Sequence, residues 1–176
     1  MKEKNVSKEQ IELFLREVDT SFPTPLSMKQ NLSDYARKLF EKATLCVEIQ
    51  DGRIVSVAAG YTENVIENRG YLSMVATADG YQGRGYAKKL VKQFLEAASD
   101  AQLDAVHLYA VSTNTKAVSM YEKLGFEEWK LSDEPRPDDL HLIYYLSIIK
   151  TGETGRSPSL LFIFYFHRSE EYLKSI

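Results

Sequence analysis

The chain has a single cysteine, Cys46, and three histidines, and it contains no long apolar run. One cysteine cannot build an intramolecular disulfide framework, which indicates a reducing compartment, so we expect a cytoplasmic protein. Because it lacks both an apolar run of about 18 residues and a signal-peptide core near Met1, we expect no membrane partner. The histidines (His107, His141 and His167) do not have the spacing of metal ligands, and we therefore expect no metal site.

Charge of one sign is also scarce. The chain carries 22 Lys and Arg residues against 25 Asp and Glu residues, which gives a formal net charge of -3. Nucleic-acid-binding surfaces are strongly basic, so this balance argues against a nucleic-acid partner. With 176 residues, of which 44% are hydrophobic, the chain is long enough to form one α/β domain with a sizeable core.

Hydrophobic periodicity and turn residues divide the chain into helices and strands. Ser7 and Gln10 form a capping box at the start of the first helix, and Asp51-Gly52 is typical of a hairpin turn. Two prolines within residues 20–27 argue against a regular helix there. We expect helices at about 8–19, 32–43, 84–99 and 115–124, and strands at 45–50, 53–61, 71–77, 105–111, 126–131 and 140–149.

The pattern predicts one domain over residues 1–150 and a C-terminal extension over residues 151–176. The extension contains the apolar run Leu160-Leu161-Phe162-Ile163-Phe164-Tyr165-Phe166. An exposed run of this kind would invite aggregation. We therefore expect it to add a strand to the sheet or to pair with a second copy of the chain in a homodimer.

The string Gln82-Gly83-Arg84-Gly85-Tyr86-Ala87 lies between an expected strand and an expected helix. Glycines at such a turn let several backbone N–H groups point outward together, and the helix dipole adds positive potential, which suits a phosphate or pyrophosphate. A Walker A loop is excluded because it requires Gly-Lys-Ser/Thr at its end, and a dinucleotide-binding loop fits poorly because Lys88 stands where a third glycine is required. A turn that only starts a helix is the alternative.

Two segments resemble the cofactor motifs of the GNAT superfamily of N-acetyltransferases. Gln82-x-x-Gly85-x-Ala87 resembles that family's Arg/Gln-x-x-Gly-x-Gly/Ala loop. The strand at 105–111 and the segment after it resemble a strand followed by Asn-x-x-Ala-x-x-x-Tyr-x-x-x-Gly-Phe. The matching residues are Asn114, Ala117, Tyr121, Gly125 and Phe126. The resemblance covers roughly residues 30–148. It implies an α/β (α+β) fold in which helices flank a mixed, mostly antiparallel central sheet.

The resemblance also implies acetyl-CoA as cosubstrate, and it assigns residues that bind it. In this family the glycine-rich loop holds the pyrophosphate, and backbone groups of the central strand pair with the pantetheine arm. The Val75 N–H would also stabilise the oxyanion of a tetrahedral intermediate. The residues expected to bind acetyl-CoA are Val75, Thr77, Gln82, Gly83, Arg84, Gly85, Tyr86, Ala87, Asn114, Ala117 and Tyr121.

Acid and base are assigned in the same way. Tyr121 occupies the family's tyrosine position near the cofactor sulfur, so we expect it to protonate the departing thiolate, the alternative being a packing role. Tyr109 stands where some members have a catalytic glutamate, and His107 shares its face of the strand. His107 is one candidate base, and Glu48, Glu63 or a chain of waters are others. For Asn114, capping of the following helix is an alternative role.

The function implied is direct transfer of an acetyl group from acetyl-CoA to a primary amine of a small molecule. By family analogy, the segment between the first helices and several tyrosines line the acceptor site; these residues are Phe22, Pro23, Pro25, Leu26, Tyr61, Tyr71 and Tyr109. The alternatives are acetylation of a protein or peptide N-terminus, a catalytically silent CoA-binding module, and a dimerisation domain that binds no cofactor.

Overall fold

The computed structural model of the chain describes residues 6–130, 136 and 138–146. The expectations for the extension at 151–176 and for the last residues of the strand at 140–149 lie outside this range. The elements, in chain order, are α1 Lys8–Glu17, the short 3-10 helix η1 Asp19–Ser21, α2 Leu26–Lys29, α3 Leu32–Lys42, β1 Thr44–Gln50, β2 Arg53–Tyr61, β3 Arg69–Thr77, α4 Tyr86–Asp100, β4 Ala105–Val111, α5 Thr115–Leu124, β5 Glu127–Glu128 and β6 Asp139–Tyr145.

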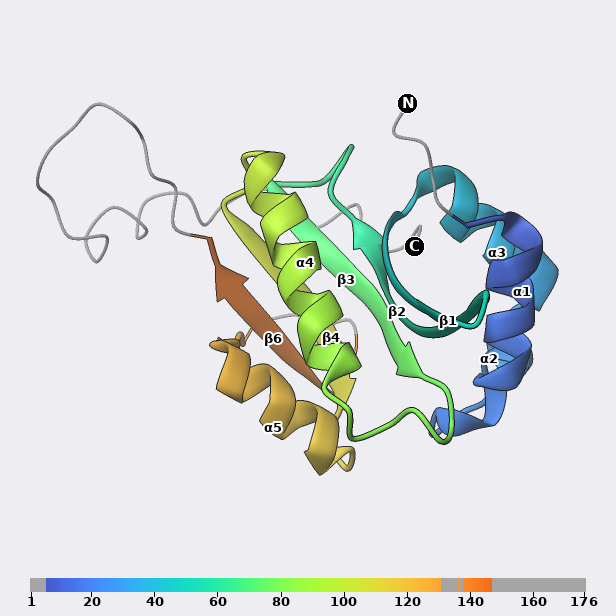
Figure 1. Cartoon of the computed structure of the whole chain (residues 1–176). Coiled ribbons are helices and arrows are strands. Elements are labelled where there is room, and N and C mark those ends of the chain that lie inside the picture. The colour runs from blue at the N-terminus through green and yellow to red at the C-terminus, as the bar shows by residue number, and fades with distance from the viewer. Residues whose placement is uncertain (1–5, 131–135, 137, 147–176) are drawn as a thin grey trace, which may run out of the picture.

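The strands form one six-stranded sheet in the order β1-β2-β3-β4-β6-β5. Every neighbouring pair is antiparallel except β3 and β4, which run parallel. The mixed, mostly antiparallel sheet expected from the sequence is therefore confirmed. The parallel pair requires a crossover connection, and α4 supplies it on one face of the sheet (Figure 1).

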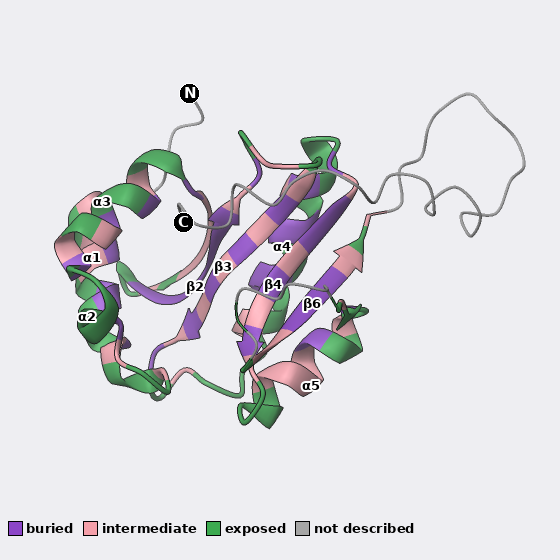
Figure 2. Cartoon of the chain, turned by 180° about the vertical axis from the view of Figure 1, so that it is seen from behind, coloured by how far each residue is buried: buried purple, intermediate pink, exposed green. Residues whose placement is uncertain are grey.

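Helices cover both faces of the sheet, but unevenly. The first helices pack over β1 and β2, where Ile11, Phe14, Leu15 and Val18 are buried as the helical spacing predicts. On the other face, α4 and α5 bury a second cluster that includes Leu90 and Phe94. No helix among the described residues lies in front of β3, β4 and β6 on the face seen in Figure 2. We call it the open face, because no helix of the described residues covers it.

The parallel ladder between β3 and β4 is short. It pairs Arg69 with Ala105, Gly70 with Val106, and Tyr71 with His107, and no later residue of β3 pairs with β4 in the described structure. The two strands therefore separate beyond Tyr71 and His107. The separation leaves backbone groups of the central strand without a neighbouring strand on that side, as the resemblance implies for the pantetheine arm.

Several element boundaries differ from the sequence prediction. The prediction of no regular helix over 20–27 is wrong at its end, because α2 begins at Leu26, directly after Pro25. Proline is compatible with a helix start, since its missing N–H would not be bonded there anyway. The strand expected at 126–131 is reduced to Glu127–Glu128, which pair only with the end of β6. The first helix ends at Glu17, where η1 follows after Val18.

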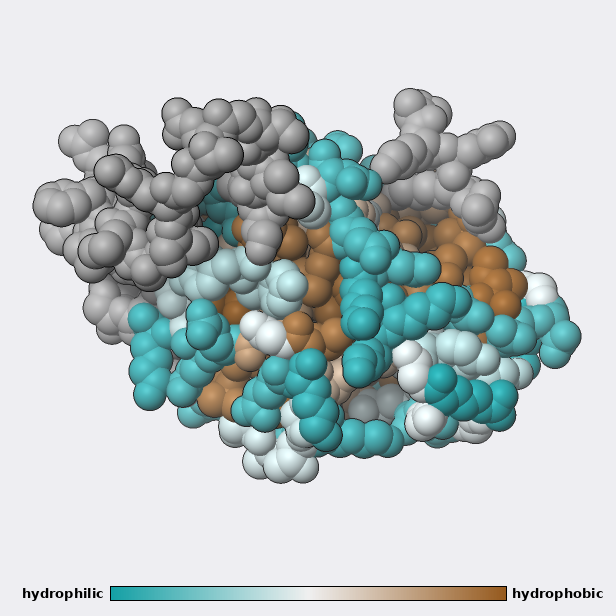
Figure 3. Space-filling model, turned by 60° about the vertical axis from the view of Figure 1, so that its left-hand side comes forward, coloured by the Kyte–Doolittle hydropathy of each residue, from teal (hydrophilic) through white to brown (hydrophobic). Residues whose placement is uncertain are grey.

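No helix in the described part of the chain is long and apolar enough to cross a membrane. In Figure 3, hydrophilic side chains form a band between hydrophobic areas on the part of the surface drawn in colour. The outward face of α4 contributes Lys88, Lys89, Lys92, Gln93 and Glu96, which line an open groove of about 440 Å³ that begins at Gly85. The groove thus carries three lysines and one glutamate, and one of the lysines, Lys89, pairs with Glu48.

Candidate active site

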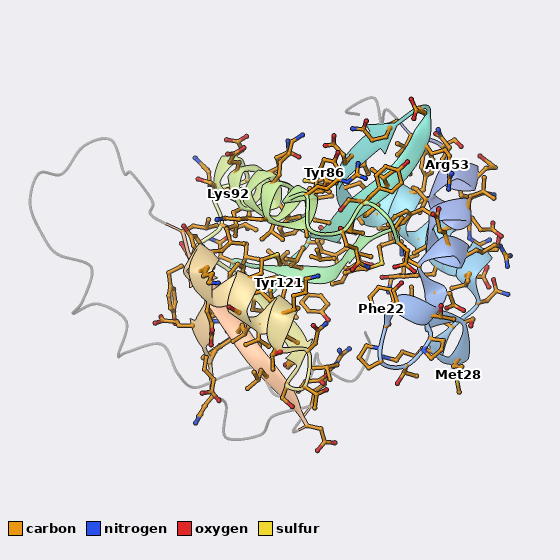
Figure 4. All side chains as sticks on the ribbon, turned by 60° about the horizontal axis from the view of Figure 1, so that its bottom comes forward. Phe22, Met28, Arg53, Tyr86, Lys92 and Tyr121 are labelled. Carbon is orange, nitrogen blue, oxygen red and sulfur yellow. The ribbon has the colours of Figure 1, made fainter. Side chains whose placement is uncertain are left out.

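The glycine-rich loop presents unbonded backbone donors at the start of α4. Gly83 and Gly85 have φ angles of 76° and 82°, a left-handed conformation that glycine adopts without a steric cost. Gly85 is the N-cap residue and contributes no side-chain hydrogen bond, and the first turn of the helix contains no acidic residue. The N–H groups of Tyr86 and Ala87 are therefore available to an anion at the positive end of a 15-residue helix (Figure 4).

The space in front of this loop is open. A Cβ atom built at Gly80, Gly83 or Gly85 would meet no atom within 4 Å. A bulky anion can consequently approach the backbone closely, which side chains at these positions would obstruct. The loop therefore fits the pyrophosphate of acetyl-CoA, the ligand that the resemblance implies.

The side chains of Gln82 and Arg84 hold the loop together in this structure. Gln82 Nε2 donates to the Thr77 carbonyl oxygen at 3.3 Å and to Asp79 Oδ1 at 3.1 Å. The Arg84 guanidinium donates to the Gly80 carbonyl oxygen at 2.8 Å and lies 5.0 Å from the centre of the Tyr81 ring. Both were expected to supply donors to the anion, and in this structure their hydrogen bonds go to the end of β3 and to the loop.

The central strand turns backbone groups toward the gap between β3 and β4. The Ala78 N–H donates to the Val55 carbonyl oxygen at 2.9 Å, so its backbone faces β2. Strand backbone groups alternate in direction, which means that Val75 and Thr77 face the opposite side, where β4 has diverged. The structure therefore places the Val75 N–H beside the opening.

The helix α5 carries the second motif. Asn114 is its N-cap, and its Oδ1 accepts a hydrogen bond from the Ala117 N–H at 3.2 Å, so the capping role is present. Tyr121 is 8% exposed, and its ring centre lies 5.6 Å from that of Phe126 (Tyr121 is labelled in Figure 4). Burial raises the pKa of the Tyr121 phenol above its ordinary value. The phenol therefore stays protonated near neutral pH, as a general acid must.

An aromatic and imidazole cluster lies on the opposite face of the sheet. His107 and Tyr109 project there, because Val106, Leu108 and Ala110 point into the core beneath α4 and α5. The ring of His107 lies 5.0 Å from that of Tyr71, and the ring of Tyr109 stacks on that of His141 at 4.2 Å. The predicted shared face of His107 and Tyr109 is thus confirmed.

His107 and His141 are joined by a hydrogen bond. Nδ1 of His107 lies 2.9 Å from Nε2 of His141, and His141 is only 4% exposed. Burial, the neighbouring His141 and Arg69 lower the pKa of His107 to about 3. His107 is therefore neutral near neutral pH.

The sequence did not single out His141. The useful signal was the alternation in Leu140-His141-Leu142-Ile143, which puts His141 and Ile143 on one face of a strand. The missing information was that β6 lies next to β4, with Tyr109 directly opposite His141 in the register. His141 then sits diagonally across from His107, a distance that long side chains can span.

The two glutamates considered as bases lie elsewhere. Glu48 on β1 bonds to Lys89 Nζ of α4 at 2.7 Å, and this contact lowers its pKa. Because Lys89 belongs to the helix on the far face, Glu48 does not join the cluster around His107. Glu63 lies in the connection between β2 and β3 and is exposed. Across the described ranges, no group of three or more His, Cys, Asp or Glu residues is placed to hold a metal ion.

Tyrosines and two cations lie in the region where the sequence predicts the acceptor site. Phe22, Tyr35 and Tyr61 pack against the cluster formed by α1 and α3, and Leu26 is part of that core. The Lys38 ammonium lies 5.8 Å from the centre of the Tyr61 ring. The Arg136 guanidinium lies 5.0 Å from the centre of the Tyr109 ring. Of the residues expected to form a wall, Leu26 is buried in this core and Phe22 is partly buried against it, whereas Pro23 is exposed.

A mixed sheet that opens between parallel strands, next to an uncapped helix N-terminus, is an architecture suited to binding an acyl-CoA. The chain belongs to the Acetyltransferase (GNAT) family, whose model matches residues 11–126. The fold is shared by the PaiA N-acetyltransferase of Thermoplasma acidophilum in complex with coenzyme A, with a TM-score of 0.61 and 12% identity over 81% of this chain and 97% of that one.

Two kinds of curated relative match the sequence. The chain is 36% identical over 62 residues to N-alpha-acetyltransferase 30 of Saccharomyces cerevisiae, and the match covers 35% of each chain. It is 35% identical over 78 residues to the mycothiol acetyltransferase of Tsukamurella paurometabola, which is 44% of this chain and 27% of that one. The matches thus span about a third of these relatives, at most, and the two relatives' names point to different acceptors.

Proposed function

We propose that this protein transfers an acetyl group from acetyl-CoA to a primary amine of a small molecule. The observation that carries the proposal is the uncapped N-terminus of α4 behind Gly83 and Gly85, beside the gap between β3 and β4. This juxtaposition offers one site for a diphosphate and another for an extended arm that pairs with strand backbone. Acetyl-CoA supplies both parts together with an activated acetyl group.

The residues of the chain take distinct roles in this proposal. The N–H groups at the start of α4 bind the diphosphate, and the Val75 N–H donates a hydrogen bond to the carbonyl oxygen on which negative charge develops. Tyr121 donates its phenolic proton to the departing thiolate, since burial keeps the phenol protonated. His107, with Tyr109 beside it, lies on the face from which the amine approaches. Asn114 and Ala117 hold α5 and thereby the Tyr121 ring in place.

The small-molecule acceptor is supported by the mycothiol acetyltransferase relative and by the open face beside Tyr71 and Tyr109. The N-alpha-acetyltransferase relative supports a peptide N-terminus as a second acceptor class. The two classes are separated by a panel that contains small primary amines and short peptides of varied N-terminal residue. Thiol release with small amines alone supports the proposal, and release with peptides alone overturns its acceptor.

The cosubstrate is tested first, by thermal unfolding with acetyl-CoA, CoA, ATP and NAD side by side. A ligand at about 100 times its dissociation constant stabilises the native state by roughly 2.7 kcal/mol. We expect stabilisation by acetyl-CoA and CoA only. If neither acetyl-CoA nor CoA stabilises the protein, the loop is only a turn and the transferase proposal fails. Binding without thiol release for any amine supports the catalytically silent module instead.

A further inference from the structure

The two edges of the sheet differ in what they offer to a further strand. At one edge, β5 consists only of Glu127 and Glu128, and both are exposed. Short, charged edge strands discourage pairing with another strand. At the other edge, β1 is seven residues long, and its one charged residue, Glu48, pairs with Lys89 at 2.7 Å. The edge suited to accept a strand is therefore the one at β1 (Figure 1).

The backbone of β1 has groups that point away from the sheet. The Val55 carbonyl oxygen of β2 bonds toward β3, and strand backbone groups alternate in direction, so Ala58 bonds toward β1. Its partner in β1 is Cys46. The residues on either side of Cys46, which are Leu45 and Val47, therefore face away from β2. In the described part of the chain, β1 pairs with β2 alone, and no backbone group bonds to Leu45 or Val47 on the outer side.

The side chains along this edge are apolar and half-buried on both faces of the sheet. Leu45 and Val47 pack in part against the core cluster of α1 and α3, as does Phe40 of α3. Cys46 packs in part against the cluster beneath α4. Because α3 and α4 both contact β1, a strand added beside it would find apolar neighbours on its two faces. A strand covered on both faces is typically a continuous apolar run rather than an alternating one.

The segment at 160–166, which lies outside the described residues, has this pattern. It reads Leu-Leu-Phe-Ile-Phe-Tyr-Phe and contains no charged residue, glycine or proline. Aromatic and β-branched residues favour strands. The run has the same length as β1, seven residues, and it is bounded by Pro158 on one side and by His167 and Arg168 on the other. The sequence therefore supplies a strand suited to the edge of β1.

The end of β6 and the start of β1 lie at the same end of the sheet. Tyr145 of β6 pairs with Ala105 at the start of β4, which in turn pairs with Arg69 at the start of β3. Thr44 at the start of β1 pairs with Gly60 close to the end of β2, and β2 runs antiparallel to β3. The chain thus leaves β6 at the end of the sheet where β1 begins.

The segment between β6 and the apolar run is long enough to reach β1. Residues 147–159 span up to about 43 Å when extended, at about 3.3 Å per residue. The position beside β1 lies five strand spacings from β6, or about 24 Å at about 4.8 Å each. A run that arrives at the start of β1 and continues along it is parallel to β1.

We propose that residues 160–166 form a seventh strand, which pairs in parallel with the outer edge of β1 in the same molecule. The backbone of this strand bonds to Leu45 and Val47, and its side chains extend the apolar clusters on both faces of β1. The long uncharged edge of the sheet is then covered. This inference does not rest on the proposed function, since the edge lies at β1 and the expected cosubstrate site lies between β3 and β4.

Amide hydrogen exchange of the full chain is the first test. The protein is labelled with ¹⁵N, and the exchange of each backbone N–H is followed by NMR. We expect the N–H groups of Leu45 and Val47 to exchange at least about 100-fold more slowly than unstructured amides, because a strand ladder protects its hydrogen bonds. Exchange of both groups at the unprotected rate overturns the proposal.

The variant Ile163→Pro tests whether residues 160–166 provide the protection. Proline has no N–H and disrupts a strand ladder. We expect Leu45 and Val47 to lose protection in this variant, whereas Cys46, which bonds to β2, retains it. Thr154→Pro is the matched control, because it places a proline before the run, and it should keep the parental protection. Unchanged protection in Ile163→Pro, or an equal loss in Thr154→Pro, overturns the proposal.

Nuclear Overhauser contacts of the parent chain give the direction of pairing and do not depend on whether a variant folds. We expect Leu160 to lie near Thr44 and Phe166 near Gln50, and the reverse order overturns the parallel pairing. Light scattering should give the mass of one chain, 20.1 kDa. A dimer in which Leu45 loses protection on dilution assigns the added strand to a second copy and overturns pairing within one molecule.

Discussion

Tyr71 and His107 form the last pair of the β3–β4 ladder, and their ring centres lie 5.0 Å apart. Beyond this pair the two parallel strands separate, so the same feature ends the ladder and opens the sheet. On the face below α4 and α5, Tyr121 belongs to the buried cluster against which Val75 of β3 packs. The cluster around His107 lies on the other face of the sheet. The sheet thus separates the expected acid from the expected proton acceptor.

Replacing Gly85 with alanine tests the anion cradle. We expect a loss of about 1–2 kcal/mol in stability, because the left-handed conformation is unfavourable for alanine. We also expect a loss of CoA affinity, because the new methyl group projects toward the open space in front of the loop. Gly52→Ala is the control, since Gly52 has a φ of 75° and an open Cβ position in the β1–β2 turn. Chemical denaturation and CoA titration measure both effects. Equal loss of affinity in both variants would contradict the prediction.

The sequence predicted those parts of the site that depend on the local chain. The glycine-rich turn, the helix after it, and the strand, Asn114 cap and helix of the second motif follow from short-range spacing, and the structure confirms them. It could not predict what depends on strand order. The bond between His107 and His141 exists only because β6 lies next to β4. In the chain, 27 residues separate the end of β4 at Val111 from the start of β6 at Asp139.

Side-chain direction was a second limit. Gln82 and Arg84 have the residue types of anion ligands, but Gln82 donates to Thr77 and Asp79 and Arg84 donates to Gly80. Glu48 was a plausible base by position on a strand, and only the packing of α4 shows that Lys89 neutralises it. In each instance a nearer partner, invisible to spacing, determines where the polar group points.

Replacing Gly60 with alanine should disturb the sheet. An added Cβ would clash with the Tyr71 carbonyl oxygen and would lie 2.6 Å from Cζ of Phe94, next to the bulge where the β2–β3 register shifts. We expect a loss of stability of at least about 1–3 kcal/mol, the usual cost of overpacking. Urea denaturation measures it.

Combining Gly60→Ala with Phe94→Leu separates the two clashes. The smaller side chain relieves the contact with the ring but not that with the Tyr71 backbone. The double variant should therefore remain at least as unstable as Gly60→Ala. Recovery of parental stability would show that the strand backbone yields, in contradiction to the close approach of β2 and β3.

The low pKa of His107 links stability to pH. Unfolded His107 has a pKa of about 6.5, whereas the native value is lower, so between the two values the unfolded chain binds the proton and the native chain does not. The contribution of His107 to stability is therefore lost as pH falls below about 6.5, by up to about 1.4 kcal/mol per pH unit. His107→Gln should lose less stability than the parent between about pH 7 and about pH 5.

Denaturation midpoints of parent and variant at each pH measure this difference. Trp129→Phe keeps both imidazoles and contacts each of them, so it should retain the parental dependence on pH. Identical slopes for His107→Gln and the parent would show that native His107 titrates like an unfolded one. That result would contradict the buried, neutral state of His107.

Tyr121→Phe tests the acid. The ring, its 8% exposure and its contact with Phe126 at 5.6 Å are all retained, so stability and CoA affinity should match the parent. Loss of the phenolic proton should lower kcat by about 10²–10⁴-fold, the range of general acid–base catalysis. The loss should be smaller for an acetyl thioester whose thiol has a lower pKa, because such a thiolate departs without protonation. Steady-state thiol release with both thioesters measures this, and an equal loss with each would remove Tyr121 from proton transfer.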